Sequence, residues 1–338
     1  MITIKDISRK CGVSPSTVSR ALADSPLLPK TTKTRIQRAA EEMGYVKNEM
    51  ATSLKTGVRR TVGVVNFVGQ NLGFAHYLFS EILNGFSTYI NDIDYDILLI
   101  SDKTLQMGEN LIPYLKSKQL GGVLILSGYY DSQGLRQLIG SDIPVVVVDP
   151  REEILLSMAD CVSSDNFSGM YELTSEIISK GHKNVVFVTG EDYYVTHERV
   201  KGFKKALADN AIPFSDQMIV RGNFYNLSAV ADNVLKILSY DNNPTCIIFS
   251  DDYCAVNAYE VLRSKGLTVG QDISVAGFDG IEMGKHMSPR LTTVVQDAET
   301  MGATAAKTLV DRMNGAEKSD TKLIPTGLFL TESVKDLN

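Results

Sequence analysis

The feature that most limits how this chain can fold is a series of short apolar runs from residue 61 onward. The runs are rich in valine and isoleucine and lie at 62–67, 95–100, 122–126, 144–148, 185–189, 245–249 and 273–278. Helical spacing is found between most of them, at 82–90, 169–179, 200–208, 229–238 and 255–265. Strands that are apolar along their whole length are typical of parallel sheets buried on both faces. The sequence therefore predicts a doubly wound α/β body, long enough for two lobes.

The first sixty residues have a different pattern, which predicts three helices. Thr3 and Asp6 have the spacing of a capping box at the start of the first helix, and Gly12 provides its left-handed exit. Ser14 can cap the second helix, with Pro15 at its first position. A third helix is expected over 30–43. Two short helices joined by a tight turn, with a third bracing them, suggest a helix-turn-helix.

The second of these helices carries the side chains expected of a DNA reader. Val18 and Leu22 are four residues apart and should face inward. This leaves small and hydroxylated side chains and one arginine facing outward: Ser14, Pro15, Ser16, Thr17, Ser19 and Arg20. Such a helix can approach base edges closely, and its arginine can reach a phosphate. A plain three-helix bundle is the alternative that periodicity alone leaves open.

The distribution of charge favours the DNA-reading interpretation. Residues 1–60 contain 12 Lys and Arg against 5 Asp and Glu; from the totals of 34 and 40, this leaves 22 against 35 for residues 61–338. The head is thus +7 and the body −13, which gives the net charge of −6. A basic head on an acidic body indicates that only the head approaches a polyanion.

The headpiece residues strongly resemble those of the lactose/galactose repressor (LacI/GalR) family. The resemblance rests on Ile4-Lys5-Asp6-Ile7 and the ungapped run Gly12-Val13-Ser14-Pro15-Ser16-Thr17-Val18-Ser19-Arg20-Ala21-Leu22. Two positions depart from the family pattern. Ala23 replaces a common asparagine that touches DNA, and Pro29 replaces a serine cap of the third helix. The resemblance implies a transcription regulator, most simply a repressor of sugar-utilisation genes that binds operator DNA.

Residues 47–60 are expected to form a hinge helix and linker between a headpiece of residues 1–46 and a body of residues 61–338. Asn48 can cap a helix on which Ala51 and Leu54 share a face, but so short a helix is not stable alone in water. The resemblance assigns Leu54 to a wedge that opens a minor-groove step, beside Asn48, Ala51 and Lys55. An ordinary linker is the alternative.

The resemblance extends through the body to its effector-binding domain, which has a fold similar to periplasmic sugar-binding proteins. It is carried by Asp165-Asn166 with Gly169, Gly181-His182, Arg199 with Gly202-Phe203, Ser250-Asp251-Asp252, Gly277-Phe278-Asp279 and 291–296. Carboxylates and a guanidinium can bind the hydroxyl pairs of a sugar, and aromatic rings can cover its apolar faces. The implied effector contacts are Arg199, Asp251, Asp279, Phe224, Phe79 and Gln296. Tyr193, Tyr194 and His197 are expected on a loop before Arg199, where they could add selectivity. Taken singly, each charged residue could instead be a solvated loop residue or a helix cap.

Enzyme motifs and metal-ligand spacings are absent from the sequence. There is no GxGxxG after a strand, no GxxxxGK[ST] and no GxSxG. The four cysteines form no CxxC pair, and the four histidines have no metal spacing. We therefore expect no catalytic site, no metal and no cofactor. A nucleotide-dependent enzyme and a sugar-binding transport protein remain the alternatives from other classes.

Partners and location follow from the same interpretation. One headpiece reads half a site, so a homodimer on operator DNA is expected. The N-terminus has no signal-peptide pattern and no stretch is long enough to span a bilayer, which predicts a cytoplasmic protein without membrane contact. A regulator that needs a corepressor or partner protein is the alternative within the family.

Overall fold

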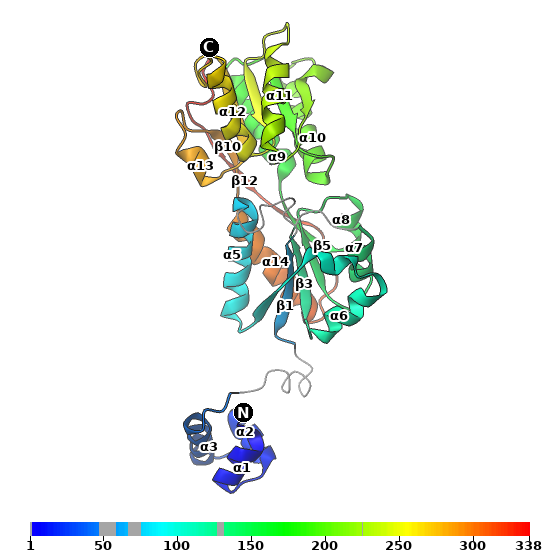
Figure 1. Ribbon diagram of the computed structural model, residues 1–338, viewed down its shortest axis with the longest axis vertical. Helices are drawn as coiled ribbons and strands as arrows, with labels where there is room; N and C mark the ends of the chain where they lie inside the picture. The colour runs from blue at the N-terminus through cyan, green and yellow to red at the C-terminus, as the bar shows by residue number, and fades with distance from the viewer. Residues whose placement is uncertain (1, 47–58, 67–75, 127–131, 225) are drawn as a thin grey trace. The chain divides into compact units, whose positions relative to one another are not determined.

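The computed structural model describes residues 2–46, 59–66, 76–126, 132–224 and 226–338, and it divides into two units (Figure 1). One unit ends at Arg59 and the other begins at Arg60. The first contains α1 (Ile4–Cys11), α2 (Pro15–Leu22) and α3 (Lys30–Glu42). Its core consists of buried residues from all three helices: Ile7, Cys11, Val18, Ala21, Ile36, Ala39 and Ala40.

The ends of the headpiece helices confirm the expected caps. Thr3 and Asp6 form a capping box, with Thr3 N donating to Asp6 Oδ2 at 2.9 Å. Gly12 has a φ of 62°, a backbone conformation that side chains disfavour. Ser14 Oγ accepts from Thr17 N at 3.1 Å and so caps α2. Pro29 provides no side-chain cap for α3. The helix-turn-helix thus forms from local signals.

The second unit contains two six-stranded sheets, which define a first and a second lobe. The first sheet has the order β11-β5-β4-β3-β1-β2 and is parallel throughout. Its strands are β1 (Thr61–Asn66), β2 (Asp96–Ile100), β3 (Gly122–Leu126), β4 (Val145–Val148), β5 (Asp160–Ser164) and β11 (Lys322–Ile324). Helices α5 (Tyr77–Asp92) and α14 (Ala298–Met313) cover one face. On the other face are α6 (Leu111–Ser117), α7 (Ser132–Ile139) and α8 (Ile154–Met158).

The second sheet repeats this order as β12-β10-β9-β8-β6-β7, with only β12 antiparallel to its neighbour. Its strands are β6 (Val185–Thr189), β7 (Ile219–Arg221), β8 (Cys246–Phe249), β9 (Ser274–Asp279), β10 (Thr292–Gln296) and β12 (Thr326–Phe329). The helices are α9 (Asn166–Ser179), α10 (Tyr194–Asp209), α11 (Leu227–Leu238), α12 (Asp252–Ser264) and α13 (Glu282–Lys285). Short 3-10 turns lie at Asp102–Gln106, Gly108–Asn110 and Asp216–Met218. The predicted two-lobed, doubly wound body is confirmed.

Three connections carry the chain from one lobe to the other. They run from β5 to α9, from β10 to α14 and from β11 to β12. The first crossing explains why β5 was not predicted. Its sequence, Asp160-Cys161-Val162-Ser163-Ser164, is largely polar, yet all five residues are buried. Their polar groups are used in hydrogen bonds near the crossings, so the apolar pattern of an ordinary buried strand is missing.

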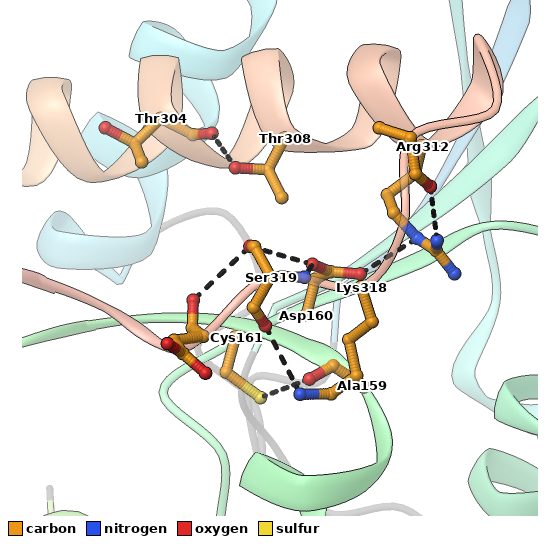
Figure 2. Close-up of polar contacts among 10 residues, drawn as sticks. Ala159, Asp160, Cys161, Thr304, Thr308, Arg312, Lys318 and Ser319 are labelled. Atoms are coloured by element: carbon orange, nitrogen blue, oxygen red, sulfur yellow. Dashed lines mark hydrogen bonds and ion pairs between the residues drawn. The ribbon is translucent and has the colours of Figure 1, made fainter.

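The start of β5 is fastened to the end of α14 by one buried carboxylate, shown in Figure 2. Asp160 is 2% exposed; one oxygen lies 3.0 Å from Arg312 Nε and the other accepts from both N and Oγ of Ser319.

Helix α14 was also missed by the sequence patterns. Its buried face contains small residues, because a Cβ at Gly302 would lie 2.0 Å from the Ile82 carbonyl oxygen of α5. That close packing replaces the usual stripe of large apolar side chains.

Candidate functional site

The exposed start of α2 presents hydroxyl groups on a helix fixed by its buried side. Ser14 Oγ lies 2.7 Å from Ser16 Oγ and 2.8 Å from Thr17 Oγ1. On the opposite side of this helix, Val18 and Ala21 are fully buried. The predicted readers Ser14, Pro15, Ser16 and Arg20 are exposed, and Thr17 and Ser19 are half-buried. A rigid helix with an exposed polar N-terminus is suited to a DNA groove.

The expected hinge contacts Asn48, Ala51, Leu54 and Lys55 lie outside the described residues.

In the body, Arg199 is at the centre of a buried polar cluster. It is 4% exposed, and its Nε donates to Asn166 Oδ1 at 2.7 Å. A second guanidinium nitrogen donates to the Ser250 backbone carbonyl, and Cζ lies 3.6 Å from the centre of the Phe278 ring. Hydrogen bonds and ring stacking together hold the guanidinium in one orientation.

The position of Arg199 corrects one expectation from the sequence. Helix α10 begins at Tyr194, so Tyr194 and His197 belong to the helix and not to a loop before Arg199, which itself lies inside the helix. Tyr193 is the N-cap residue. The aromatic and β-branched residues at 193–196 have modest helix propensity, and tertiary packing overrides it. A Cβ at Gly202 of α10 would lie 2.3 Å from the Phe167 carbonyl oxygen of α9, which shows how closely the two helices pack.

Asp279, the last residue of β9, is joined to Arg199 by charge and to the first lobe by hydrogen bonds. Its Oδ1 accepts from Gln296 Nε2 at 2.7 Å, and Gln296 Oε1 accepts from Ser164 Oγ at 2.6 Å. Asp279 is 4% exposed. Burial raises the pKa of Asp279 well above its ordinary value, and the positive charge of Arg199 opposes that rise. The predicted trio of Arg199, Asp279 and Gln296 therefore lies together.

Asp251 has the capping role that the sequence left open. It is fully buried as the N-cap of α12, and its Oδ1 accepts from Cys254 N at 2.7 Å. Its negative charge also acts on Asp279, whose pKa it raises. Asp251 thus combines a structural role with proximity to the cluster.

Asp252 was not among the predicted site residues, and it makes three hydrogen bonds inside the second lobe. Its Oδ2 accepts from the N–H groups of Gly280 and Ile281 at 2.8 and 2.9 Å, and its Oδ1 accepts from the Thr293 hydroxyl at 2.6 Å. Burial raises the pKa of Asp252 to about 7, although these hydrogen bonds favour the charged form. Asp252 therefore fixes the turn that follows Asp279.

Aromatic and cationic groups form a stack beside Arg199. Phe224 lies with its ring centre 5.8 Å from the Arg199 guanidinium carbon and stacks on Tyr193, the ring centres being 6.5 Å apart. The Arg151 guanidinium carbon lies 3.8 Å from the centre of the Tyr193 ring. Arg151 follows β4 of the first lobe, and its carbonyl accepts from Tyr194 N at 2.7 Å. The stack thus bridges the two lobes.

Phe79 lies near the start of α5 and is linked to the second lobe through His76. Its ring centre is 4.4 Å from that of His76, which faces Tyr253 of the second lobe at 6.5 Å. His76 caps α5 and is 1% exposed. Burial lowers the pKa of His76 to about 4, so the ring is neutral at ordinary pH.

Sequence reasoning missed the first-lobe side of the cluster. Asp149 is 8% exposed, and its Oδ1 accepts from Ser163 Oγ at 2.6 Å. Ser163 in turn accepts from Asn166 Nδ2 at 3.3 Å, which continues the chain of contacts to Arg199. Asp149 directly follows an apolar run, as Asp279 does, and this position was the signal that could have identified it.

The described residues of the site provide polar and aromatic groups. Among the residues that the structure describes, no group of three or more His, Cys, Asp or Glu is placed to hold a metal ion. The same residues include no helix both long and apolar enough to cross a membrane. Acceptors, a stacked guanidinium and aromatic rings are the usual components of a site for a small polar ligand.

Comparison with known proteins agrees with both halves of this description. Residues 3–48 match the profile of "Bacterial regulatory proteins, lacI family", and residues 174–334 match that of a periplasmic binding protein-like domain. The HTH-type transcriptional repressor PurR of Vibrio atlanticus is 31% identical over 319 residues, covering 93% of this chain and 92% of the relative. Catabolite control protein A of Priestia megaterium is 29% identical and covers 96% of both chains.

Solved structures share the fold along nearly the whole chain. A complex of the transcriptional regulator CelR with cellobiose is 25% identical, with a TM-score of 0.73 over 98% of this chain and 100% of that one. A lac repressor dimer bound to operator and the anti-inducer ONPF superposes with a TM-score of 0.83 at 21% identity, covering 99% of each chain. These relatives are regulators and not enzymes. The chain belongs to the LacI family of bacterial transcription regulators, with a DNA-binding headpiece and an effector-binding body.

Proposed function

We propose that this protein represses genes of sugar utilisation in the cytoplasm, and that a small sugar-like effector controls its binding to operator DNA. The observation that carries the proposal is the buried cluster around Arg199. It holds one guanidinium between acceptors of two lobes, through Asn166 and the charges of Asp149 and Asp279. A ligand bound there would contact both lobes and so favour one lobe arrangement over another.

The proposed effector contacts are the residues that sequence and geometry single out together. Arg199, Asp251, Asp279 and Gln296 would bind hydroxyl groups, and Phe224 and Phe79 would cover apolar faces of the ring. Support comes from burial, since four of the six are at most 5% exposed: Arg199, Asp251, Asp279 and Gln296. Charged groups held in place before binding lose little freedom when the ligand arrives.

The DNA-binding surface would be the exposed start of α2 together with the hinge segment. Ser14, Pro15, Ser16, Thr17, Ser19 and Arg20 would enter the major groove, and Asn48, Ala51, Leu54 and Lys55 would act in the minor groove. Two copies of the chain would read a palindromic site, because one headpiece covers only half of it.

The DNA half of the proposal is tested on an operator selected from randomised duplex DNA with the full-length protein. Affinity is measured by fluorescence anisotropy over a range of salt concentrations for wild type and Arg20→Ala. We expect Arg20→Ala to weaken binding and to reduce the salt slope by about one. Lys236→Ala, which removes an exposed cation of α11 in the body, is the matched control. If Arg20→Ala and Lys236→Ala changed operator affinity and its salt slope equally, α2 would not be part of the DNA interface.

The effector half is tested by thermal unfolding in the presence of sugars and their derivatives. A molecule that binds the native state raises the melting temperature by mass action. Each molecule that does so is then added to the operator complex of wild type and Arg199→Lys. We expect the added molecule to change the operator affinity of wild type and to leave that of Arg199→Lys unchanged. If no bound molecule altered operator affinity, effector control would be wrong for this chain.

A further inference from the structure

Buried carboxylates outnumber buried cations around the candidate effector site. Four aspartates there are at most 8% exposed: Asp149, Asp251, Asp252 and Asp279. Among the described residues of this cluster, Arg199 is the buried cation, and Arg151 is a half-buried one at the lobe contact. Even with both counted, the negative groups are in twofold excess. Burying a charge without an opposite charge is costly, so burial and like charges raise the pKa of Asp252 and Asp279, and a bound cation would favour the charged forms of both.

Body segments outside the described residues do not supply the missing positive charge. Residues 67–75, 127–131 and 225 contain no lysine or arginine. His76, which contacts Phe79 and faces Tyr253, is neutral because burial lowers its pKa to about 4. These segments and His76 therefore do not offset the excess of buried carboxyl groups around the candidate effector site.

Asp279 is the carboxylate with unused binding capacity. Its Oδ1 accepts from Gln296, whereas its Oδ2 is buried and has no hydrogen-bond partner among the described residues. Since a buried carboxyl oxygen is normally hydrogen-bonded, the unpartnered Oδ2 indicates room for a ligand group that donates to it. The other end of the same carboxylate is already fixed, so a ligand would meet it in a set orientation.

Asp279 also lines a cavity of about 530 Å³ between the lobes, which is the size of a site for a small ligand. Its wall includes Glu81 of α5 and Asp297 and Glu299 at the start of α14. Lys285 is its one cation, and that lysine is paired with Glu282 at 2.8 Å. The cavity that Asp279 lines is therefore acidic.

We propose that the effector carries a protonated amine, which donates to Asp279 Oδ2, so that amino sugars and related hydroxylated amines are its chemical class. An ammonium group supplies both the missing charge and the missing donor, and its neighbouring hydroxyls can donate to the remaining acceptors. A phosphorylated or carboxylated sugar would bring negative charge toward carboxyl groups that are already costly to ionise, and is disfavoured. This inference rests on the proposed function and narrows its ligand.

The test compares amines with their hydroxyl and phosphate counterparts near neutral pH. Glucosamine, galactosamine and mannosamine are each paired with glucose, galactose and mannose, and glucose 6-phosphate is the anionic probe. Binding to the full-length protein is measured by thermal unfolding and then by calorimetry. We expect at least one amine to bind roughly 10- to 100-fold more tightly than its hydroxyl counterpart, as for a hydrogen bond to a charged group. The phosphate should not bind.

Three variants test whether the preference for an amine over a hydroxyl depends on the carboxylate of Asp279. Asp279→Asn keeps an acceptor for Gln296 and removes the charge, so the ratio of amine to hydroxyl affinity should fall to about one. Asp251→Asn removes a charge from the cluster but keeps a helix cap, and should reduce the ratio less. Asp232→Asn on α11, which lies outside the cavity lining, is the control and should preserve it.

Three results would overturn the inference: no amine binding above its hydroxyl counterpart, tightest binding of the phosphate, or an unchanged ratio in Asp279→Asn. These results differ from failure of the proposed function. A neutral or anionic sugar that binds and alters operator affinity would leave effector control intact and exclude only the amine. If no bound ligand changed the operator affinity, effector control would be refuted, whatever the charge of the ligand.

Discussion

The headpiece and the body place their functional groups in opposite environments. In the headpiece, Ser14, Ser16 and Arg20 are exposed, and ion pairs such as Arg9 with Asp6 lie at the surface. In the body, Arg199 and Asp279 are each 4% exposed. A reader of a long polyanion needs groups that meet the polymer from outside, whereas a sensor of a small molecule must surround it. The contrast teaches that exposed functional groups of the headpiece, such as Ser16 and Arg20, can be changed with little loss of stability, whereas the buried groups of the body cannot.

The largest effect is expected when the body loses its central cation. Arg199→Ala leaves Asp149 and Asp279 without their shared positive charge and removes the donors to Asn166 and Ser250. Removing one partner of a buried charged pair typically costs about 3–5 kcal/mol. Denaturant unfolding of the body should show this loss, and Lys236→Ala should not. A loss below about 1 kcal/mol would mean that the cluster contributes little to the fold.

The next effect is a dependence on pH that originates at Asp252. Its folded-state pKa is raised from 3.8 to about 7, so the native state holds a proton that the unfolded chain has released between these values. The native state therefore loses stability as pH rises through that window, by up to about 4 kcal/mol, and no more is lost above it.

Asp252→Asn is the variant that isolates this effect. It removes the titrating group while keeping an acceptor for the N–H groups of Gly280 and Ile281, so the fall in unfolding free energy between about pH 4 and 7 should become shallower. Measurement of that free energy across the window in both proteins checks the prediction. Parallel curves would show that Asp252 does not carry the proton.

A smaller effect on DNA binding is expected at the hinge. Leu54→Ala should weaken operator affinity by about tenfold and reduce DNA bending, because an apolar wedge between base steps stabilises the kink. Ligand affinity without DNA should stay the same. Leu235→Ala, at an exposed leucine of α11, is the comparison variant. If Leu54→Ala and Leu235→Ala behaved alike in affinity and bending, residues 47–60 would be a linker.

The smallest effect is expected at the cap of α2. Ser14→Ala removes the bond from Thr17 N and should lower headpiece stability by about 1 kcal/mol, whereas Ser14→Asn should retain most of it. The shift is measured by the thermal unfolding of the headpiece signal in circular dichroism. Body stability should be the same in all three proteins, and a change there would contradict the separation of the two units.

Sequence reasoning succeeded where a local signal determines local structure. The cap at Ser14 and the exit at Gly12 depend on neighbours a few residues away, so both could be predicted. The polar strand β5 could not, because its residues are buried for their hydrogen bonds and not for apolar packing. Helix α14 was missed for a related reason: its contact with α5 requires small residues such as Gly302.

The candidate site was predictable in its residue types but not in its connections. Arg199 and Asp279 could be selected because they match family positions, and Asp279 also ends the apolar strand β9, whereas Arg199 lies inside α10 and not at its start. Their partners, Asn166, Ser250 and Asp149, are separated in sequence and meet only after both sheets form. Asp252 could not be selected from sequence, because its partners Gly280, Ile281 and Thr293 are distant along the chain.

The most direct test of the whole account is reciprocal linkage between the two regions. The affinity of operator DNA is measured with and without a bound effector, and the affinity of the effector with and without operator, in wild type and Arg199→Lys. We expect both affinities of the wild type to change by one common factor, roughly 5- to 150-fold, and neither to change in the variant. Wild-type affinities that are independent of each other, or a full response in Arg199→Lys, would contradict the claim that the buried cluster controls the exposed reader.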